Sequence, residues 1–217
     1  MDDRCEAILK LLLEAVQANS SNTQPQDNPD EIPVGVSNRH VHLSQKDLNV
    51  LFGEGYNITK FKDLSQPGQY ACKETITICG PKGAIEKVRI LGPIRSKTQV
   101  EVLTGDCFKL GIAPHTRLSG NLCNTPGITL IGPKGSVQIE EGVMVAQRHI
   151  HMSTEDAIKF GVTDGQVVSI QFGDIRGGIY NNVAIRANDT SVLECHIDTE
   201  EANAMNINGK SKIKIIK

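Results

Sequence analysis

Beyond Ile32 the chain consists of short runs in which apolar and polar residues alternate, and Gly, Pro and Asn separate the runs. Alternation with a period of two is typical of half-buried β-strands, because successive side chains point to opposite faces. The density of turns excludes a helical bundle, and the sequence therefore predicts a mainly β protein with short helices. The clearest predicted strands are residues 74–78, 84–91, 127–131, 167–172 and 183–186.

A different pattern precedes these strands. Residues 1–18 place apolar side chains such as Ile8, Leu12 and Val16 on one side of a helical wheel, which predicts an amphipathic helix. Residues 19–31 are rich in Ser, Asn, Gln, Asp and Pro, and this composition predicts a flexible linker. The polar face of the helix is not basic, so a groove or helix on another protein is favoured over an anionic membrane. The alternative is a helix that docks on its own domain or across a homodimer.

Two sequence motifs occur twice, which indicates an internal duplication. SNRHVHLS at residues 37–44 recurs as AQRHIHMS at 146–153, and ITICGPKG at 76–83 recurs as ITLIGPKG at 128–135. Closure of a sheet removes its exposed edges, so the duplicated strands predict two tandem small β-barrel domains. We place them at residues 32–120 and 121–217, with approximate boundaries across which strands can be exchanged. The Gly-Pro-Lys-Gly segments match no phosphate-loop spacing and are predicted to close β-hairpins.

Charge and composition narrow the possible functions. The chain has 217 residues, and 23 Lys and Arg against 25 Asp and Glu give a net charge of −2, which disfavours a nucleic-acid partner. Only 4% of the residues are aromatic, so a stacking platform for bases is also disfavoured. No apolar run approaches the roughly 20 residues that span a bilayer, and neither a basic start nor a Cys-x-x-Cys motif is present. We therefore expect a soluble, intracellular protein with reduced cysteines and no membrane partner.

Four of the six histidines lie in the two copies of one motif. On a strand, His40 and His42 point to the same face, as do His149 and His151, so each pair offers two ligands to one metal ion. A Ser-x-x-Asp helix start follows each pair and places it at the end of a strand. Neutral imidazole suits zinc best among the common cellular metals, with cobalt, nickel and iron as alternatives. The other interpretation is a set of solvated or hydrogen-bonded histidines without a metal.

Further candidate ligands lie on two other predicted strands. Near the C-terminus, alternation places His196 on one face with Glu194 and Asp198, and His196 is predicted to be the third ligand of one histidine pair. In the first half, residues 98–102 alternate in the same way, and Glu101 is predicted to be a carboxylate ligand for the other histidine pair. Arg95 follows a strand and a Gly-Pro turn, where its planar guanidinium can bind an oxyanion or a phosphate. The residues alone thus predict a duplicated β protein with a histidine-rich metal site.

Longer motifs occur along the chain in a fixed order: GVSNRHVHLS (35–44), QPGQYA (66–71), LGPIRS (91–96), SGNL (119–122), VAQRHIHMS (145–153) and HIDT (196–199). They resemble the PduL family, the phosphate propanoyltransferases of bacterial microcompartments, and the resemblance covers Ile32 to the C-terminus. It implies tandem β-barrels, a dinuclear zinc centre and the reaction acyl-CoA + phosphate ⇌ acyl phosphate + CoA, with propanoyl as the expected acyl group. The chemistry of such a site requires no covalent acyl-enzyme, so we expect phosphate to attack the acyl-CoA directly.

The resemblance assigns roles to individual residues. It implies that one zinc ion is held by His40, His42 and Glu101, and the other by His149, His151 and His196. Arg95 is expected to bind phosphate. The residues expected to line the CoA site are Ser37, Lys62, Arg89, Leu91 and Asn203.

Partners and location are expected from the same resemblance. The N-terminal helix and linker resemble in type the encapsulation peptide of the family, which implies shell or core proteins as partners and the microcompartment lumen as the location, or the cytoplasm without encapsulation. A homo-oligomer is expected. Two other functions stay open: a dinuclear zinc hydrolase of a thioester, and a non-catalytic zinc-stabilised microcompartment adaptor. Three protein ligands for each metal leave one position open, which favours a catalytic role.

Overall fold

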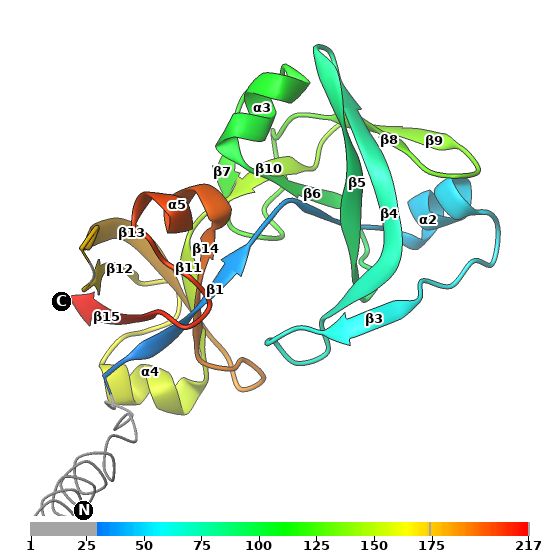
Figure 1. Cartoon of the computed structure of the whole chain (residues 1–217). Helices are drawn as coiled ribbons and strands as arrows, with labels where there is room; N and C mark the ends of the chain where they lie inside the picture. Colours follow the sequence, from blue (N-terminus) through cyan, green and yellow to red (C-terminus); the bar gives the residue numbers. More distant parts are fainter. Residues whose placement is uncertain (1–29, 174, 217) are drawn as a thin grey trace, which may run out of the picture. The chain divides into compact units, whose positions relative to one another are not determined.

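The computed structural model describes residues 30–173 and 175–216. The strands in these residues form two β-sheets. Figure 1 shows a small sheet of blue, yellow and red strands beside a larger sheet of cyan and green strands. Residues 32–217 make up one unit of the chain. The predicted amphipathic helix at residues 1–18, and residues 19–29 of the predicted linker, lie outside the described residues.

The smaller sheet is a closed barrel of strands in the order β1, β14, β11, β13, β12, β15. The strands are β1 (Ile32–Ser37), β11 (His149–Met152), β12 (Val167–Phe172), β13 (Gly178–Ala187), β14 (Glu194–Asp198) and β15 (Lys212–Ile216). β1 pairs in parallel with β14 and antiparallel with β15, so the first described strand closes a barrel whose other strands come from residues 149–216.

The larger sheet has nine strands and forms a half-barrel. Its main path runs β7, β10, β6, β2, β5, β4, β8, β9, and β3 pairs with β4 beside this path. The strands are β2 (His40–His42), β3 (Lys60–Asp63), β4 (Tyr70–Gly80), β5 (Gly83–Gly92), β6 (Gln99–Val102), β7 (Thr116–Arg117), β8 (Ile128–Ile131), β9 (Ser136–Ile139) and β10 (Val143–Ala146). The predicted mainly β fold is confirmed, with one barrel closed and the other half closed.

The two sheets do not divide the chain at residue 120. β1 lies in the barrel although it precedes the larger sheet, and β8 to β10 lie in the larger sheet although they follow residue 120. β8 joins the larger sheet because it pairs with β4, where Leu130 is the ladder partner of Ile78. Strands of each sheet therefore come from both sides of the predicted boundary, and the division into β-barrel domains at residues 32–120 and 121–217 stays a prediction.

A short helix follows each histidine motif, as the Ser-x-x-Asp pattern predicts. The backbone N–H of Asp47 donates to the hydroxyl of Ser44, and that of Asp156 donates to the hydroxyl of Ser153, at 3.2 and 3.0 Å. These caps start α2 and α4 directly after β2 and β11. No helix among the described residues has the length and apolar composition needed to cross a membrane. The helices are α2 (Gln45–Phe52), α3 (Thr104–Leu110), α4 (Thr154–Phe160) and α5 (Thr199–Ala204).

The Gly-Pro-Lys-Gly segments close two hairpins, as predicted. One connects β4 to β5 and the other connects β8 to β9. At Gly80 an added Cβ would lie 2.2 Å from the carbonyl oxygen of Leu110, so the close approach of α3 to this turn requires glycine.

Each sheet has its own apolar core, and the residues that alternate with the motif histidines belong to these cores. Val41 and Leu43 lie in the core of the larger sheet, Ile150 and Met152 lie in that of the barrel, and all four have no exposed surface. Because neighbours along a strand point to opposite faces, the core residues fix the histidines on the other face. The cores also contain the free cysteines Cys72, Cys107 and Cys195.

Candidate metal and substrate site

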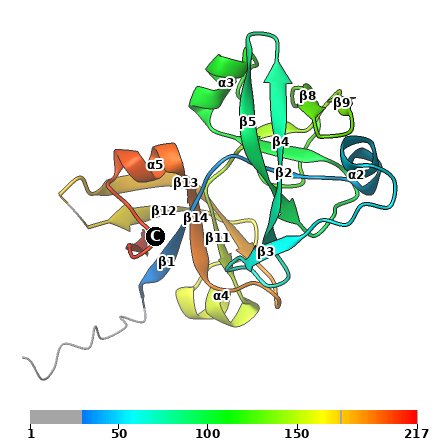
Figure 2. The ribbon, with the colours of Figure 1, turned by 45° about the vertical axis from the view of Figure 1, so that its right-hand side comes forward.

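A cavity of about 510 Å³ is lined by residues of both sheets. The predicted site residues in its lining are Ser37, His40, His42, Arg89, Leu91, Arg95, Glu101, His149, His151 and His196. Lys62 on β3 and Asn203 on α5 are exposed and lie outside the lining. The structure thus brings the predicted metal ligands and Arg95 together, and it leaves two predicted CoA contacts at the surface. Figure 2 shows the two sheets that contribute these residues.

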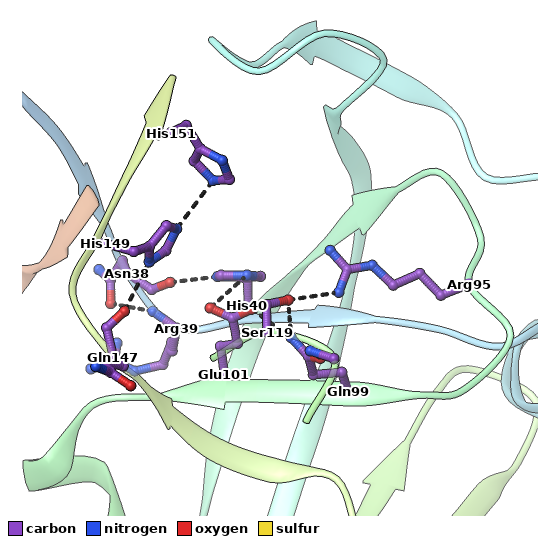
Figure 3. A network of polar contacts seen from close by, with 11 residues as sticks. Asn38, Arg39, His40, Arg95, Gln99, Glu101, Ser119, Gln147, His149 and His151 are labelled. Carbon is purple, nitrogen blue, oxygen red and sulfur yellow. Dashed lines mark hydrogen bonds and ion pairs between the residues drawn. The ribbon is translucent and has the colours of Figure 1, made fainter. Parts of the chain in front are cut away.

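The first ligand group lies in the larger sheet. His40 and Glu101 are direct partners in the antiparallel ladder of β2 and β6, and Nε2 of His40 lies 3.4 Å from Oε2 of Glu101 (Figure 3). His42 lies on the same face of β2 and completes the group. Nδ1 of His40 donates to the backbone carbonyl oxygen of Asn38 at 2.8 Å. A proton held on Nδ1 in this way makes Nε2, on the side of Glu101, the nitrogen available to a metal ion.

The second ligand group lies in the barrel. His149 on β11 is the ladder partner of His196 on β14, and His151 faces both, with ring centroids 4.7 to 5.2 Å apart within the group. The Nε2 atoms of His149 and His151 are 3.1 Å apart. Two nitrogens at tetrahedral positions around zinc lie about 3.3 Å apart, so the observed spacing matches a shared ion. Nδ1 of His149 donates to the carbonyl oxygen of Gln147 at 2.8 Å, as His40 does to Asn38.

Burial keeps most of these imidazoles neutral. Burial, together with the charge of a neighbouring histidine, lowers the pKa of His42 and His151 to about 3 and that of His149 to about 4. Burial also disfavours charge on His40, but the Glu101 carboxylate beside it raises the pKa of His40 above its ordinary value. In return, His40 holds the pKa of the buried Glu101 carboxyl below its ordinary value. Neutral imidazoles and an ionised carboxylate are the forms that bind metal ions.

Both groups fit a bound metal ion. The donor atoms of each group lie within 4.8 Å of one another. Nδ1 of His42 and Nδ1 of His151 are buried and lack a hydrogen-bond partner among the described residues. Buried polar atoms without a partner are rare, and on the ring of a ligand histidine they often mark the place of an ordered water that orients the ring. Three nitrogens in one group, and two nitrogens with a carboxylate oxygen in the other, are donor sets that zinc accepts.

The arginine of each repeated motif fastens its strand to a helix. Nε of Arg39 lies 2.7 Å from a carboxylate oxygen of Asp106, and Nε of Arg148 lies 2.7 Å from a carboxylate oxygen of Glu201. Asp106 and Glu201 both stand at the third position of their helices, α3 and α5. These matching ion pairs orient the two histidine motifs in the same way with respect to α3 and α5, the helices that follow β6 and β14 in the chain.

Arg95 reaches the cavity from the segment that follows β5. Its backbone N–H donates to the carbonyl oxygen of Leu43 at 2.9 Å, and its guanidinium donates to the hydroxyl of Ser119 at 3.1 Å. The amide of Gln99 donates to the same hydroxyl at 2.8 Å and to Oε1 of Glu101 at 2.6 Å (Figure 3). The network holds Arg95 beside the first ligand group.

Glu194 extends the second ligand group. Its carboxylate lies 2.5 Å from Nε2 of His196 and accepts a hydrogen bond from the hydroxyl of Ser65. Gln66, which follows Ser65, forms two hydrogen bonds with the backbone of Val192. Its side-chain amide donates to the carbonyl oxygen at 2.9 Å and accepts from the backbone N–H at 3.2 Å. The loop between β3 and β4 is therefore attached to the barrel beside the cavity.

Sequence reasoning did not single out Ser119 and Arg186, which line the cavity, or Gln99, which donates to Ser119 and Glu101 beside it. Gln99 shares a strand face with Glu101, so the alternation contained a signal for it. Arg186 alternates with the buried Ile185, which shows only that its side chain leaves the core. The pairing of β13 with β11, which brings Arg186 into the cavity, joins distant segments and has no local signal. Ser119 lies in a turn-rich segment without periodicity.

Known proteins resemble this chain over most of its length. The matching family model is that of phosphate propanoyltransferase, over residues 33–208. A phosphate propanoyltransferase of Rhodobacter capsulatus is 51% identical over 190 residues, which are 88% of this chain and 88% of the relative. One of Thermotoga maritima is 54% identical over 187 residues, 85% of this chain and 89% of the relative. One of Salmonella typhimurium is 54% identical over 174 residues, 80% of this chain and 82% of the relative.

Proposed function

The chain belongs to the phosphate propanoyltransferase family, and we propose that it moves a propanoyl group between CoA and inorganic phosphate with zinc ions bound in the cavity. As a member of this family it is a phosphate acyltransferase. The observation that carries the zinc proposal is the convergence of two ligand groups on one cavity that also contains Arg95.

The two ligand groups hold one ion each in this proposal. One zinc binds His40, His42 and Glu101, and the other binds His149, His151 and His196. When bound, zinc supplies Lewis-acid stabilisation of the negative charge on the phosphate and on the leaving sulfur. The carbonyl oxygens of residues 38 and 147 fix the rings of the first histidine in each motif, which raises their basicity as ligands. Three protein ligands for each ion leave a position for substrate.

Phosphate attacks the thioester directly in this proposal. A phosphate oxygen forms a bond to the carbonyl carbon, the bond from that carbon to sulfur breaks, and the proton of the phosphate ends on the CoA sulfur. Arg95 binds two phosphate oxygens through its planar guanidinium and offsets their charge. The hydroxyl of Ser119 orients this guanidinium before phosphate arrives. Orientation of both reactants then supplies a large part of the rate enhancement.

The lining supports transfer without a covalent acyl-enzyme. Among the described residues, the lining contains no cysteine. The ring nitrogens of His40, His149 and His196 contact a carbonyl oxygen, another imidazole or a carboxylate, and in the described part of the chain none of them contacts a serine hydroxyl. The hydroxyl of Ser65 donates to the Glu194 carboxylate, but no imidazole of the described residues contacts it. A serine–histidine or cysteine–histidine pair, the usual source of an acyl-enzyme, is therefore not found among the described lining residues.

The proposed CoA site extends from the cavity to the surface. Ser37, Arg89 and Leu91 line the cavity. Lys62 is the ladder partner of Ala71, which is in turn the ladder partner of Leu91, so one row across β3, β4 and β5 connects the exposed lysine to the cavity. A row of this kind suits a long ligand whose thiol end is buried and whose phosphate groups reach a surface cation. Asn203 on α5 is proposed as a further surface contact.

Location and partners belong to the same proposal. Residues 1–18 form a targeting helix that binds microcompartment shell or core proteins, and the enzyme works as a homo-oligomer in the microcompartment lumen. The amphipathic pattern of these residues and the polar composition of residues 19–31 support this assignment.

A phosphate-dependent CoA-release assay tests the proposed reaction. Zinc-loaded protein is supplied with acetyl-, propanoyl- and butanoyl-CoA, with and without phosphate, and free thiol and acyl phosphate are measured. Phosphate-dependent thiol release with an equal amount of acyl phosphate, fastest for propanoyl-CoA, is expected. Thiol release without phosphate would identify a thioester hydrolase. A folded protein that is inactive with and without zinc would identify an adaptor.

A further inference from the structure

Arg186 on β13 lies beside His151 in the wall of the cavity. β13 pairs in parallel with β11, and Arg186 is the direct ladder partner of His151. Partners on neighbouring strands point to the same face of a sheet, and both residues belong to the cavity lining. A strand of the barrel thus brings a second cation into the cavity, next to the second ligand group.

Arg186 differs from the other arginines around the cavity in what holds its side chain. Arg39 and Arg148 form 2.7 Å ion pairs with helix carboxylates. Arg89 donates to two backbone carbonyl oxygens, at 3.0 and 2.7 Å. Within residues 30–173 and 175–216, the guanidinium of Arg186 has neither an ion pair nor a hydrogen bond. Its donors are therefore available to a ligand in the cavity.

Arg186 and Arg95 enter the cavity from different sheets. Arg95 belongs to the larger sheet, where its guanidinium contacts Ser119. Burial lowers the pKa of Arg95, and the positive charge of Arg186 lowers it further, while the Glu101 carboxylate acts in the opposite direction. Both guanidinium groups line the same cavity, and their like charges repel each other. An anion bound between them relieves this repulsion.

The first copy of the repeat shows that the fold does not need an arginine at this position. β5 pairs in parallel with β2 in the same way as β13 pairs with β11, with Val41 beside Ile90. One residue further along β5, Leu91 stands next to His42, which is the place of Arg186 next to His151. The larger sheet has an apolar side chain at this position, so the pairing of the strands does not require a cation there. The charge of Arg186 is therefore available for a role in the cavity.

We propose that Arg186 is a phosphate-binding residue that holds the anion from the barrel side, opposite Arg95. Three oxygens of phosphate remain after one has attacked the thioester, so two planar guanidinium groups can share them. The same pair of cations holds the phosphoryl group of the acyl phosphate when the reaction runs in reverse. The proposal rests on the proposed phosphate acyltransferase reaction and adds a substrate contact from the second sheet.

Steady-state kinetics of Arg186→Gln test this proposal. Arg176→Gln is the matched control, because Arg176 is exposed between β12 and β13 and lies outside the cavity lining. With zinc-loaded full chain and saturating propanoyl-CoA, the phosphate KM of Arg186→Gln should rise about 10-fold or more. The KM for propanoyl-CoA should stay within about twofold of wild type. Arg186→Lys should recover part of the loss, and Arg176→Gln should match wild type.

A binding measurement separates substrate contact from structural damage. Calorimetric titration of the zinc-loaded protein with inorganic phosphate should show weaker binding in Arg186→Gln at unchanged zinc content and melting temperature. A wild-type phosphate KM and Kd, or a rise confined to the KM for propanoyl-CoA, would overturn the proposal. Should Arg186→Gln fail to fold, Arg186→Lys is judged by the same criteria. Wild-type turnover that needs no phosphate would overturn the proposed function instead, so the two failures are distinguishable.

Discussion

Glu101 stands opposite His40 in the larger sheet as His196 stands opposite His149 in the barrel. In both cases the residue is the antiparallel ladder partner of the first histidine in the motif. The duplicated fold thus presents the same arrangement of donors twice, with a carboxylate in one copy and an imidazole in the other. An ion in the larger sheet is therefore partly neutralised by its ligands, and one in the barrel keeps its full charge.

Metal content tests the two ligand groups. Purified wild-type protein should contain about two zinc ions per chain, and His196→Ala should contain about one, because each ion depends on three protein donors. His115→Ala is the control, since His115 lies outside the cavity lining, and it should keep the wild-type content. Elemental analysis that finds one ion or none in wild-type protein would contradict the dinuclear centre.

Exchange of the donor types tests the equivalence of Glu101 and His196. Glu101→His copies the barrel ligand group into the larger sheet, so this variant should keep both zinc ions, whereas Glu101→Ala should lose one. Elemental analysis and zinc titration with a chromogenic chelator measure the difference. Equal zinc loss in both variants would show that the ladder position alone does not place the donor correctly.

Arg95→Lys tests the requirement for a planar cation. An ammonium group presents one point charge where a guanidinium binds two oxygens, so kcat should fall and the phosphate requirement should rise. The loss should amount to about 2–4 kcal/mol in transition-state stabilisation if the contact tightens there. Zinc content and CoA binding should not change, and Arg95→Ala should be worse. Wild-type kcat and phosphate KM in the lysine variant would reduce Arg95 to a structural role.

The zinc-free protein should lose stability in acid. Burial lowers the pKa of His42 and His151 to about 3 and that of His149 to about 4, from 6.5, so unfolding takes up protons at these groups. The free energy of unfolding should therefore fall as the pH falls from about 6.5 towards 4. The raised pKa of His40 acts in the opposite direction but is a single group. Urea unfolding of zinc-free wild type and of His151→Gln at several pH values measures this slope, which should be shallower in the variant.

Deletion of residues 1–31 should separate targeting from catalysis. The truncated protein begins at β1, whose Ile32 pairs with Ile213, so the barrel is retained. Activity in the CoA-release assay should be close to wild type, while recruitment to microcompartment shell proteins should be lost. A truncation that folds but is inactive would show that the N-terminal segment takes part in the reaction.

The sequence predicted those parts of the site that depend on local patterns. Period-two alternation is a property of a single strand, so it placed His40 with His42 and His149 with His151 and located Glu101 on its strand. The helix caps also depend on four consecutive residues. The repeat added the information that the same local structure occurs twice.

Pairing between distant segments was not predictable in this way. The barrel contains β1 because Val34 pairs with Cys195, and nothing near Val34 indicates that partner. The position of Arg186 in the cavity likewise depends on the register of β13 against β11. Register is fixed by the packing of the whole barrel, so it appears only in the three-dimensional structure.

The closure of the barrel by β1 has a consequence during synthesis on the ribosome. β1 leaves the ribosome first among the described strands, but its partners β14 and β15 are made only after the whole larger sheet. In a nascent chain, the larger sheet can therefore bring His40, His42 and Glu101 together before β14 and β15, the pairing partners of β1, have been synthesised. The barrel, with its contacts of high sequence separation, forms last. A chain whose synthesis stops before β14 leaves the apolar residues of β1 unpaired. Such a chain should be less soluble than one that includes β14 and β15.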